Sequence, residues 1–156
     1  MVKSTPATVV LRKADLAFIL HEYDYDPNAD SIGLQAADAL GVSPTRLFKT
    51  LMIRAGNEVV CALAPSDREI SLKKLAAAAQ SKQAFLLPPA DAERVTGYHV
   101  GGISPFGQKR RVETFIDRSA LDHATVIVNG GRRGLQIELA PEAAIRFLNA
   151  KAVSLC

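Results

Sequence analysis

The N-terminal part of the chain alternates between helical and strand patterns of apolar positions. An amphipathic segment begins after Thr5-Pro6, and because proline is tolerated in a first helical turn, this segment predicts a helix. Residues 18–23, which begin with the apolar residues Phe18-Ile19-Leu20, are typical of a strand. Ser31 then caps a predicted helix that extends to Ala39, and Gly41 ends it.

The middle of the chain predicts a hairpin followed by a helix. Residues 47–53 and 58–63 are apolar runs, and the short stretch 54–57 between them contains glycine and asparagine, which indicates a hairpin loop. Ser71 caps a predicted helix that extends to Ala79. After it come a predicted strand at 84–87 and a predicted helix at 90–95, closed by Gly97.

Further strands are predicted in the last third of the chain, at residues 112–117, 125–129 and 135–139. Asn129-Gly130-Gly131 is a turn signal between the last two, and Pro141 begins a final helix. The chain therefore has more strands than two βαβ units need, and most of their connections are short. This pattern favours an α+β fold in which a mixed or mainly antiparallel sheet curls into a barrel surrounded by helices.

The composition fits one globular domain that spans residues 1–156. Hydrophobic residues make up 48% of the sequence and charged residues 22%, which argues against a fibre or a disordered tail. Cys61 and Cys156 lie far apart, with no C-x-x-C motif and no histidine at ligand spacing, so neither a disulfide framework nor a zinc site is indicated. Because no signal-peptide pattern or long apolar stretch is found, we expect a cytoplasmic protein without a membrane or metal partner.

The net charge of +3 is too small to identify a nucleic-acid partner, but the charge is unevenly distributed. Residues 1–100 carry 11 basic and 11 acidic side chains, whereas residues 101–156 carry 8 basic and 5 acidic ones. The excess lies in Lys109-Arg110-Arg111 and Arg132-Arg133. A polyanion could bind in that part of the chain.

Lys49 interrupts an otherwise apolar predicted strand. Lysine is almost never fully buried without a partner, and strand alternation places Lys49 on the same face as Leu51 and Ile53. We therefore expect its ammonium group at the mouth of a pocket or beside an anion. The simpler alternative is a lysine at a strand end whose ammonium group reaches solvent.

Residues 96–109 contain Gly97, Gly101, Gly102, Pro105 and Gly107, which indicates a tightly turned loop. Its backbone amides can approach a ligand without side chains in the way, so the loop could bind a phosphate or an oxyanion. It matches neither of the glycine-rich nucleotide-binding motifs, and a purely structural turn is the alternative.

No catalytic triad is indicated by the sequence. None of the histidines lies in a serine or cysteine nucleophile motif, and a single histidine is more often structural. They are His21, His99 and His123. A hydrolase built on this chain would need another source of nucleophile.

Three motifs occur in order along the chain: the strand at 48–51, the glycine-rich segment at 96–109 and the segment at 130–139. Together they closely resemble the YbaK (EbsC) family, free-standing relatives of the editing domain of bacterial prolyl-tRNA synthetases. The resemblance implies a partly open β-barrel with surrounding helices. It also implies a Cys-tRNA(Pro) deacylase that needs no cofactor and acts on mischarged tRNA(Pro) beside prolyl-tRNA synthetase.

The resemblance implies roles for individual residues. Lys49 matches the essential lysine that orients the aminoacyl ester, and Gly101 begins the Gly-x-x-x-Pro loop, whose amides bind around the scissile carbonyl. Tyr23 matches a tyrosine of the substrate pocket. The other substrate-binding residues implied are Ile32, Gly102, Ile103, Ser104, Pro105 and Asn129.

In Cys-specific members of that family, the thiol of the substrate is thought to attack its own ester carbonyl, giving a thiolactone and free tRNA. A thiol has a pKa of about 8.5, so some thiolate exists near neutrality without an enzymatic base. This mechanism is consistent with the missing triad. It would also spare correctly charged Pro-tRNA on chemical grounds.

The sequence departs from the Cys-specific pattern at three positions. Ile32 stands in place of a phenylalanine, Asn129 in place of a serine, and Gln136 where some relatives have an acid. A deacylase that uses water against Ala-tRNA(Pro) or another small aminoacyl-tRNA is therefore an alternative. A further alternative is a non-catalytic module that binds tRNA or synthetase through the basic residues near Arg110 and Arg132.

Overall fold

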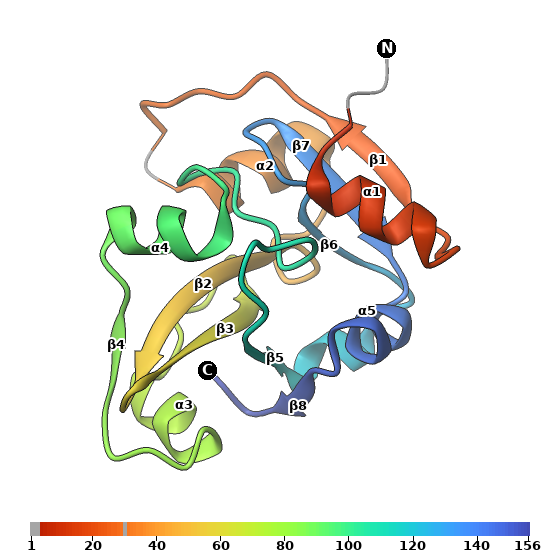
Figure 1. The fold of residues 1–156 in the computed structure, drawn as a ribbon. Helices are drawn as coiled ribbons and strands as arrows, with labels where there is room; N and C mark the ends of the chain where they lie inside the picture. Colours follow the sequence, from red (N-terminus) through yellow and green to blue (C-terminus); the bar gives the residue numbers. More distant parts are fainter. Residues whose placement is uncertain (1–3, 30) are drawn as a thin grey trace.

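Residues 4–29 and 31–156, which the computed structural model describes, form five α-helices and eight strands arranged in two sheets (Figure 1). In chain order the elements are α1 (Pro6–Lys13), β1 (Ile19–Glu22), α2 (Ile32–Leu40), β2 (Phe48–Ala55), β3 (Glu58–Pro65), α3 (Leu72–Ala78), β4 (Ala84–Leu86), α4 (Pro89–Thr96), β5 (Glu113–Asp117), the 3-10 helix η1 (Arg118–Asp122), β6 (Val126–Asn129), β7 (Leu135–Leu139), α5 (Pro141–Leu148) and β8 (Lys151–Val153).

The helices begin and end at residues that the sequence identifies as caps. The hydroxyl of Ser31 accepts a hydrogen bond from the N–H of Leu34, and Ser71 does the same for Lys74. Gly41 and Gly97 end α2 and α4 in the left-handed conformation, with φ of 68° and 79°. The helices predicted from the sequence are confirmed, and where both ends are predicted the boundaries differ by only one residue.

The larger sheet has the strand order β4-β2-β3-β5-β8, and the smaller sheet has the order β1-β7-β6. An isolated bridge between Leu47 and Ile127 links them, but the two sheets do not close into a full barrel. The predicted α+β fold, a partly open mixed barrel with surrounding helices, is therefore confirmed. The sequence did not predict β8, which pairs in parallel with β5.

The hairpin of β2 and β3 has a tighter turn than predicted. The ladder continues through the Arg54–Val59 and Ala55–Glu58 pairs, so only Gly56 and Asn57 form the turn. Gly56 has φ of 62°, a conformation that a two-residue hairpin turn requires and that glycine adopts without strain.

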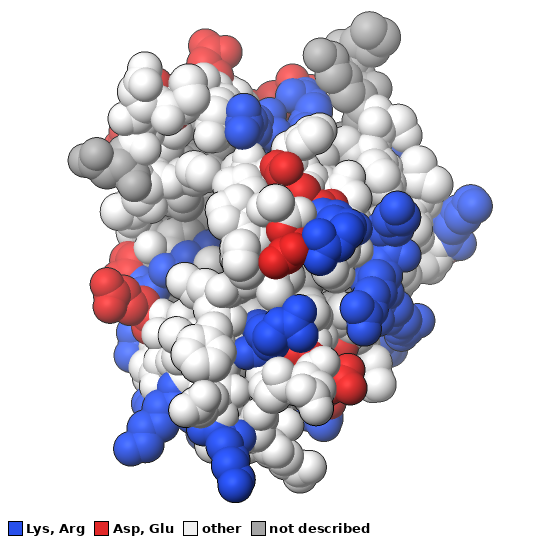
Figure 2. Space-filling model, turned by 60° about the vertical axis from the view of Figure 1, so that its left-hand side comes forward, with Lys and Arg blue, Asp and Glu red and all other residues white. Residues whose placement is uncertain are grey.

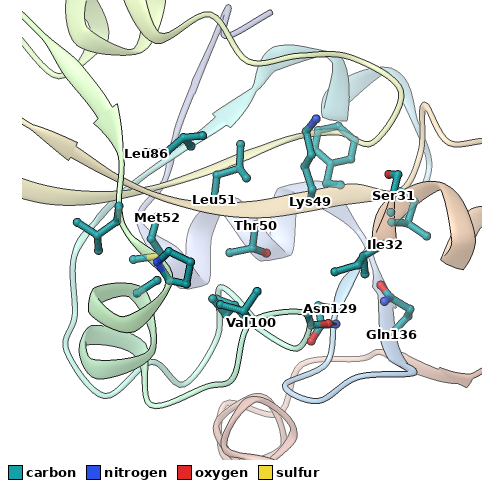
Figure 3. Close-up of a pocket in the computed structure, with 18 residues that line it drawn as sticks. Ser31, Ile32, Lys49, Thr50, Leu51, Met52, Leu86, Val100, Asn129 and Gln136 are labelled. Carbon is teal, nitrogen blue, oxygen red and sulfur yellow. Dashed lines mark hydrogen bonds between the residues drawn. The ribbon is translucent and has the colours of Figure 1, made fainter. Parts of the chain in front are cut away.

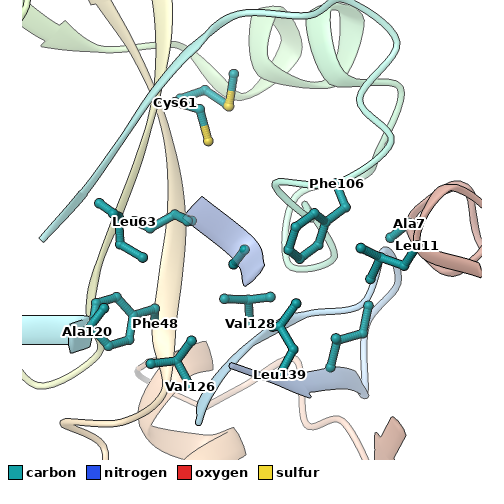
Figure 4. Close-up of a cluster of buried hydrophobic side chains, with 14 of the residues drawn as sticks. Ala7, Leu11, Phe48, Cys61, Leu63, Phe106, Ala120, Val126, Val128 and Leu139 are labelled. Carbon is teal, nitrogen blue, oxygen red and sulfur yellow. The ribbon is translucent and has the colours of Figure 1, made fainter. Parts of the chain in front are cut away.

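The main hydrophobic core anchors the glycine-rich segment between α4 and β5. Phe106, from this segment, is fully buried beside Ala7 and Leu11 of α1 and near Val128 (Figure 4). Its ring also makes an edge contact with Phe147 at a centroid distance of 5.8 Å. Among the described residues, no helix is long and apolar enough to cross a membrane.

A polar cluster around Glu138 links the small sheet to the segment before β2. The Glu138 carboxylate accepts hydrogen bonds from Thr125 Oγ1 at 2.5 Å and Arg46 Nη2 at 2.7 Å. His21 Nε2 lies 2.7 Å from its other oxygen. The hydrogen bond from Thr125 is the largest cause that lowers the pKa of Glu138, followed by the hydrogen bond from His21.

We expect Glu138→Gln to lower the free energy of unfolding at pH 7 by about 1–3 kcal/mol, because Arg46 and His21 lose a charged acceptor. A lowered pKa stabilises the fold above the unfolded-state pKa, and this stability is lost as the pH falls through the folded-state pKa. Chemical unfolding across a pH series should therefore show the difference between wild type and variant shrinking in acid.

Glu22→Gln is the matched control, because Glu22 lies 3.4 Å from Arg132 but its side chain is 53% exposed. It should change stability by less than about 0.5 kcal/mol. A difference for Glu138→Gln that stays constant from neutral pH to acid would contradict the role assigned to its carboxylate.

Candidate active site

A cavity of about 440 Å³ lies between the edge of β2 and the glycine-rich segment. Its walls come from five parts of the chain that are far apart in sequence. They are residues 31–33 at the start of α2, residues 47–52 of and before β2, the stretch from the end of β4 into α4, the loop residues Val100, Gly101 and Ile103, and Asn129 and Gln136 from the small sheet. Most of these side chains are apolar, as in typical small-molecule sites.

The alternation of β2 decides which side chains face the loop. Leu51 and Ile53 pack against the cluster that contains Leu75 of α3, as the alternation predicted for the Lys49 face. Thr50 and Met52 point to the other side of the strand, toward Val100 and the loop (Figure 3). The glycine-rich segment therefore faces the hydroxyl group of Thr50.

Lys49 lies on the rim of the cavity, and its ammonium group turns away from Gly101. Figure 3 shows the Lys49 side chain on the opposite side of β2 from Thr50. Its Nζ donates a hydrogen bond of 2.6 Å to the backbone carbonyl of Arg68. The Lys49 side chain is half-buried. The predicted position at the mouth of a pocket therefore fits the aliphatic part of this side chain better than its ammonium group.

Hydrogen bonds at both ends hold the glycine-rich segment in place. Tyr98 Oη donates to the carbonyl of Phe106 at 2.5 Å, and the N–H of Lys109 donates to the carbonyl of Thr96 at 2.8 Å. Gln108 Nε2 donates to the carbonyl of Ser104 at 3.0 Å. The loop is thus a fixed framework, and its free amide groups are preorganised.

Gly101 is a loop residue on the cavity wall whose amide remains available to a ligand. Its carbonyl accepts a hydrogen bond of 3.2 Å from Asn129 Nδ2. The amide of the next residue, Gly102, donates to the backbone carbonyl of His99. No acceptor for the Gly101 N–H is found among the described residues. Gly101 has φ of 93°, which side chains rarely tolerate, and it lines the cavity.

The structure brings some of the predicted site residues together and separates others. Ile32, Ile103 and Asn129 line the same cavity as Lys49 and Gly101. Gly102 instead packs against the backbone of Arg132, on the outer side of the loop. Ser104 and Pro105 are buried and do not line this cavity, so their contribution is to the shape of the loop.

Tyr23 does not line the cavity, but it lies close to the cavity residue Gln136. Burial raises the pKa of Tyr23, and the neighbouring Gln136 offsets part of the rise. The Tyr23 Oη, the Gln136 Oε1 and the Thr50 Oγ1 are buried and lack a hydrogen-bond partner in the described structure. Thr50 and Gln136 line the cavity, and because unpaired buried polar groups are costly, these two are candidates to bind a polar ligand.

The sequence does not identify Thr50 as a site residue, and it marks Gln136 only as a departure from the family pattern. The signal for Thr50 was present, because the alternation that separates it from Lys49 places it on the loop side. Gln136 gave no such signal, since its position depends on how the small sheet meets β2.

The cavity offers no strong protein nucleophile. Cys61 is fully buried, and burial raises the pKa of its thiol to about 12, so the reactive thiolate is absent at neutral pH. His21 is bound to Glu138, and His99 is an exposed residue beside Glu93. In residues 4–29 and 31–156, no group of three or more His, Cys, Asp and Glu side chains could hold a metal ion.

Comparisons with known proteins point to one kind of activity. A family model described as an aminoacyl-tRNA editing domain matches residues 26–147. The chain is 39% identical over 133 residues to EbsC of Enterococcus faecalis, a proposed Cys-tRNA(Pro)/Cys-tRNA(Cys) deacylase, with 83% of this chain and 80% of EbsC covered.

Two further similarities concern prolyl-tRNA synthesis. A proline–tRNA ligase of a Thermoanaerobacter species is 29% identical over 116 residues, which are 73% of this chain and 20% of the ligase. The crystal structure of a proposed trans-editing enzyme for prolyl-tRNA synthetase superimposes with a TM-score of 0.82 at 19% identity, covering 99% of this chain and 98% of that one. At this identity the superposition shows the fold alone.

Proposed function

Because this chain belongs to the aminoacyl-tRNA editing domain family, we propose that it releases a wrongly attached amino acid from tRNA(Pro), and that this amino acid is cysteine. The observation that carries the proposal is the free N–H of Gly101, held on the wall of a cavity large enough for an aminoacyl group. An ester carbonyl placed there would receive a preorganised hydrogen-bond donor where negative charge develops during the reaction.

The chemistry of cysteine compensates for the missing protein nucleophile. Its thiol loses a proton, and the sulfur attacks the carbonyl carbon of the same residue's ester. The C–O bond to the ribose then breaks, and the ribose oxygen takes up a proton to give free tRNA. Water opens the thiolactone product. In this mechanism the protein has to orient the ester and stabilise the oxyanion.

Lys49 acts, in this proposal, from the rim of the cavity. Its ammonium group exchanges the Arg68 carbonyl for the negatively charged backbone at the 3′ end of the tRNA. A positive charge at that position attracts the nucleic acid and fixes how deeply the aminoacyl group enters. The position of Lys49 on the rim of the cavity supports this role.

A second candidate is a deacylase that uses water and acts on Ala-tRNA(Pro) or another small aminoacyl-tRNA. The unpaired Thr50 hydroxyl and Gln136 amide oxygen favour it, because a water molecule needs such polar partners. The third candidate, a binding module without turnover, depends on basic residues alone. On the face shown in Figure 2, several Lys and Arg side chains adjoin one another on the right-hand side, and elsewhere they are interspersed with Asp and Glu.

We infer that mischarged tRNA(Pro) is the substrate and that prolyl-tRNA synthetase is a partner that supplies tRNA identity. The similarity to part of a proline–tRNA ligase supports this inference. In the ligase the matching segment belongs to the same polypeptide as the rest of the enzyme. A separate chain of the same fold would gain selectivity for tRNA(Pro) by binding the synthetase.

A panel of aminoacyl-tRNAs, tested with and without the synthetase, checks the proposal. We expect release from Cys-tRNA(Pro), little release from Pro-tRNA(Pro), and loss of release when the cysteine thiol is methylated. Faster release from Ala-tRNA(Pro), with no effect of thiol methylation, would select the second candidate. Binding without release from any of these tRNAs would select the third.

A further inference from the structure

The Arg133 side chain extends from the turn between β6 and β7 to the outer side of the glycine-rich loop. Its Nε donates a hydrogen bond of 3.0 Å to the carbonyl of Val100. Its guanidinium carbon lies 5.4 Å from the centre of the Tyr25 ring, a cation–π contact that fixes the plane of the group. Arg133 is therefore held between a tyrosine and one peptide bond of the loop.

That peptide bond joins Val100 to Gly101, the residue with the free N–H. It is trans, because no cis peptide is found among the described residues. In a trans peptide the C=O and the N–H point to opposite sides of the bond. Since Arg133 binds the carbonyl on the outer side, the Gly101 N–H points the other way, away from Arg133.

Arg133 and Tyr25 also occupy the space beside the Cα of Gly101 that a Cβ atom would need. A Cβ atom on Gly101 would lie 3.0 Å from both Arg133 Nε and Tyr25 Oη, whereas Gly101 itself lines the cavity. The following peptide is fixed in the same way, because Asn129 Nδ2 binds the Gly101 carbonyl. The orientation of the Gly101 amide thus depends on Asn129 at the end of β6 and on Arg133 in the turn that follows.

We propose that Arg133 is a positioning residue, which fixes the Val100–Gly101 peptide so that the Gly101 N–H points into the cavity and binds the ester carbonyl of the substrate. This inference rests on the proposed deacylase function. Arg133 acts through its Nε hydrogen bond and needs no contact with the substrate. Its positive charge is secondary to that hydrogen bond.

A direct contact with a tRNA phosphate is the competing role for Arg133. Such a contact would use the charge, and it would appear as a KM that depends strongly on salt concentration. The observed geometry favours positioning, because the Nε group is already used by the Val100 carbonyl and the guanidinium plane is packed against Tyr25.

Two substitutions separate the hydrogen bond from the charge. Arg133→Gln places an amide N–H₂ group where Nε lies and removes the charge. Arg133→Lys keeps the charge but places a methylene group at that position. Arg118→Met is the control for loss of a surface charge, since Arg118 is exposed and its side chain makes no hydrogen bond or ion pair in the described structure.

The experiment measures single-turnover release of cysteine from Cys-tRNA(Pro) at two salt concentrations, together with the ¹⁵N–¹H spectrum of the Gly101 amide. We expect Arg133→Lys to lower the rate at least about tenfold with KM within about twofold, and to shift the Gly101 amide signal. Arg133→Gln should stay within about threefold of wild type with an unshifted signal, because it retains the donor. Arg118→Met should behave as wild type.

Each other result overturns the inference. Full activity in Arg133→Lys, equal loss in both variants, or a change confined to KM and its salt dependence would show that Arg133 does not act by holding the peptide. If wild type releases no amino acid from any aminoacyl-tRNA, the proposed function fails, and the inference fails with it. Activity in wild type together with full activity in Arg133→Lys would refute the inference alone.

Discussion

Gly101→Ala is expected to lower the rate of cysteine release from Cys-tRNA(Pro) by about 100-fold or more. Gly101 has φ of 93°, and an added Cβ would lie 3.0 Å from both Arg133 Nε and Tyr25 Oη. To relieve the contact and the strain, the peptide must rotate, and the N–H then leaves its position at the carbonyl. Loss of one such donor costs about 10²–10³ in kcat in acyl-transfer enzymes.

Gly41→Ala is the matched control for Gly101→Ala. Gly41 also has a positive φ, of 68°, but a Cβ there would meet nothing within 4 Å, and the residue lies at the end of α2 away from the cavity. Both variants should lose about 1 kcal/mol of stability from backbone strain, and only Gly101→Ala should lose activity. A rate for Gly101→Ala within threefold of that for Gly41→Ala would contradict the role of this amide.

Lys49→Ala is expected to reduce kcat/KM for Cys-tRNA(Pro) by about 100-fold while the fold stays intact. The variant removes the positive charge on the cavity rim that positions the 3′ end of the tRNA, and misplacement of about 1 Å can cost 10²-fold. The hydrogen bond of Lys49 to the Arg68 carbonyl lies at the surface, so its loss should change stability by less than about 1 kcal/mol. Deacylation kinetics and thermal unfolding measure the two effects separately.

Lys74→Ala controls for the loss of a surface lysine. Lys74 Nζ also donates a hydrogen bond of 2.6 Å to a backbone carbonyl, that of Cys156, but Lys74 does not line the cavity. It should retain the activity of wild type. Full activity in Lys49→Ala, or an equal loss in Lys74→Ala, would remove Lys49 from the proposed mechanism.

The parts of the fold that the sequence predicted are those with local signals. Ser31 and Ser71 mark helix starts through hydrogen bonds to amides three residues away, and Gly41 ends a helix by its own conformation. The strand β8 could not be predicted in this way. It has three residues, and it exists because β5 offers an open edge to a distant segment.

In the candidate site too, local sequence patterns identify some residues, whereas the positions of others depend on the whole fold. Lys49 and Gly101 both lie on the cavity wall, and the sequence identified both from a local pattern and a family resemblance. The direction of the Lys49 side chain depends on which cluster covers each face of β2, and that is a property of the whole fold. The contact of Arg133 with Val100 joins loops 33 residues apart, and no local pattern indicates it.

The most direct test is an NMR titration of the ¹⁵N-labelled protein with 3′-cysteinylamino-3′-deoxyadenosine, which mimics the tRNA end and carries an amide in place of the ester. Because the Gly101 N–H should donate to its carbonyl, we expect the Gly101 amide proton to shift downfield and saturate, together with signals of other cavity residues. Shifts confined to the outer side of the loop around Glu93 and Arg132, with the Gly101 amide unchanged, would show that the substrate binds elsewhere.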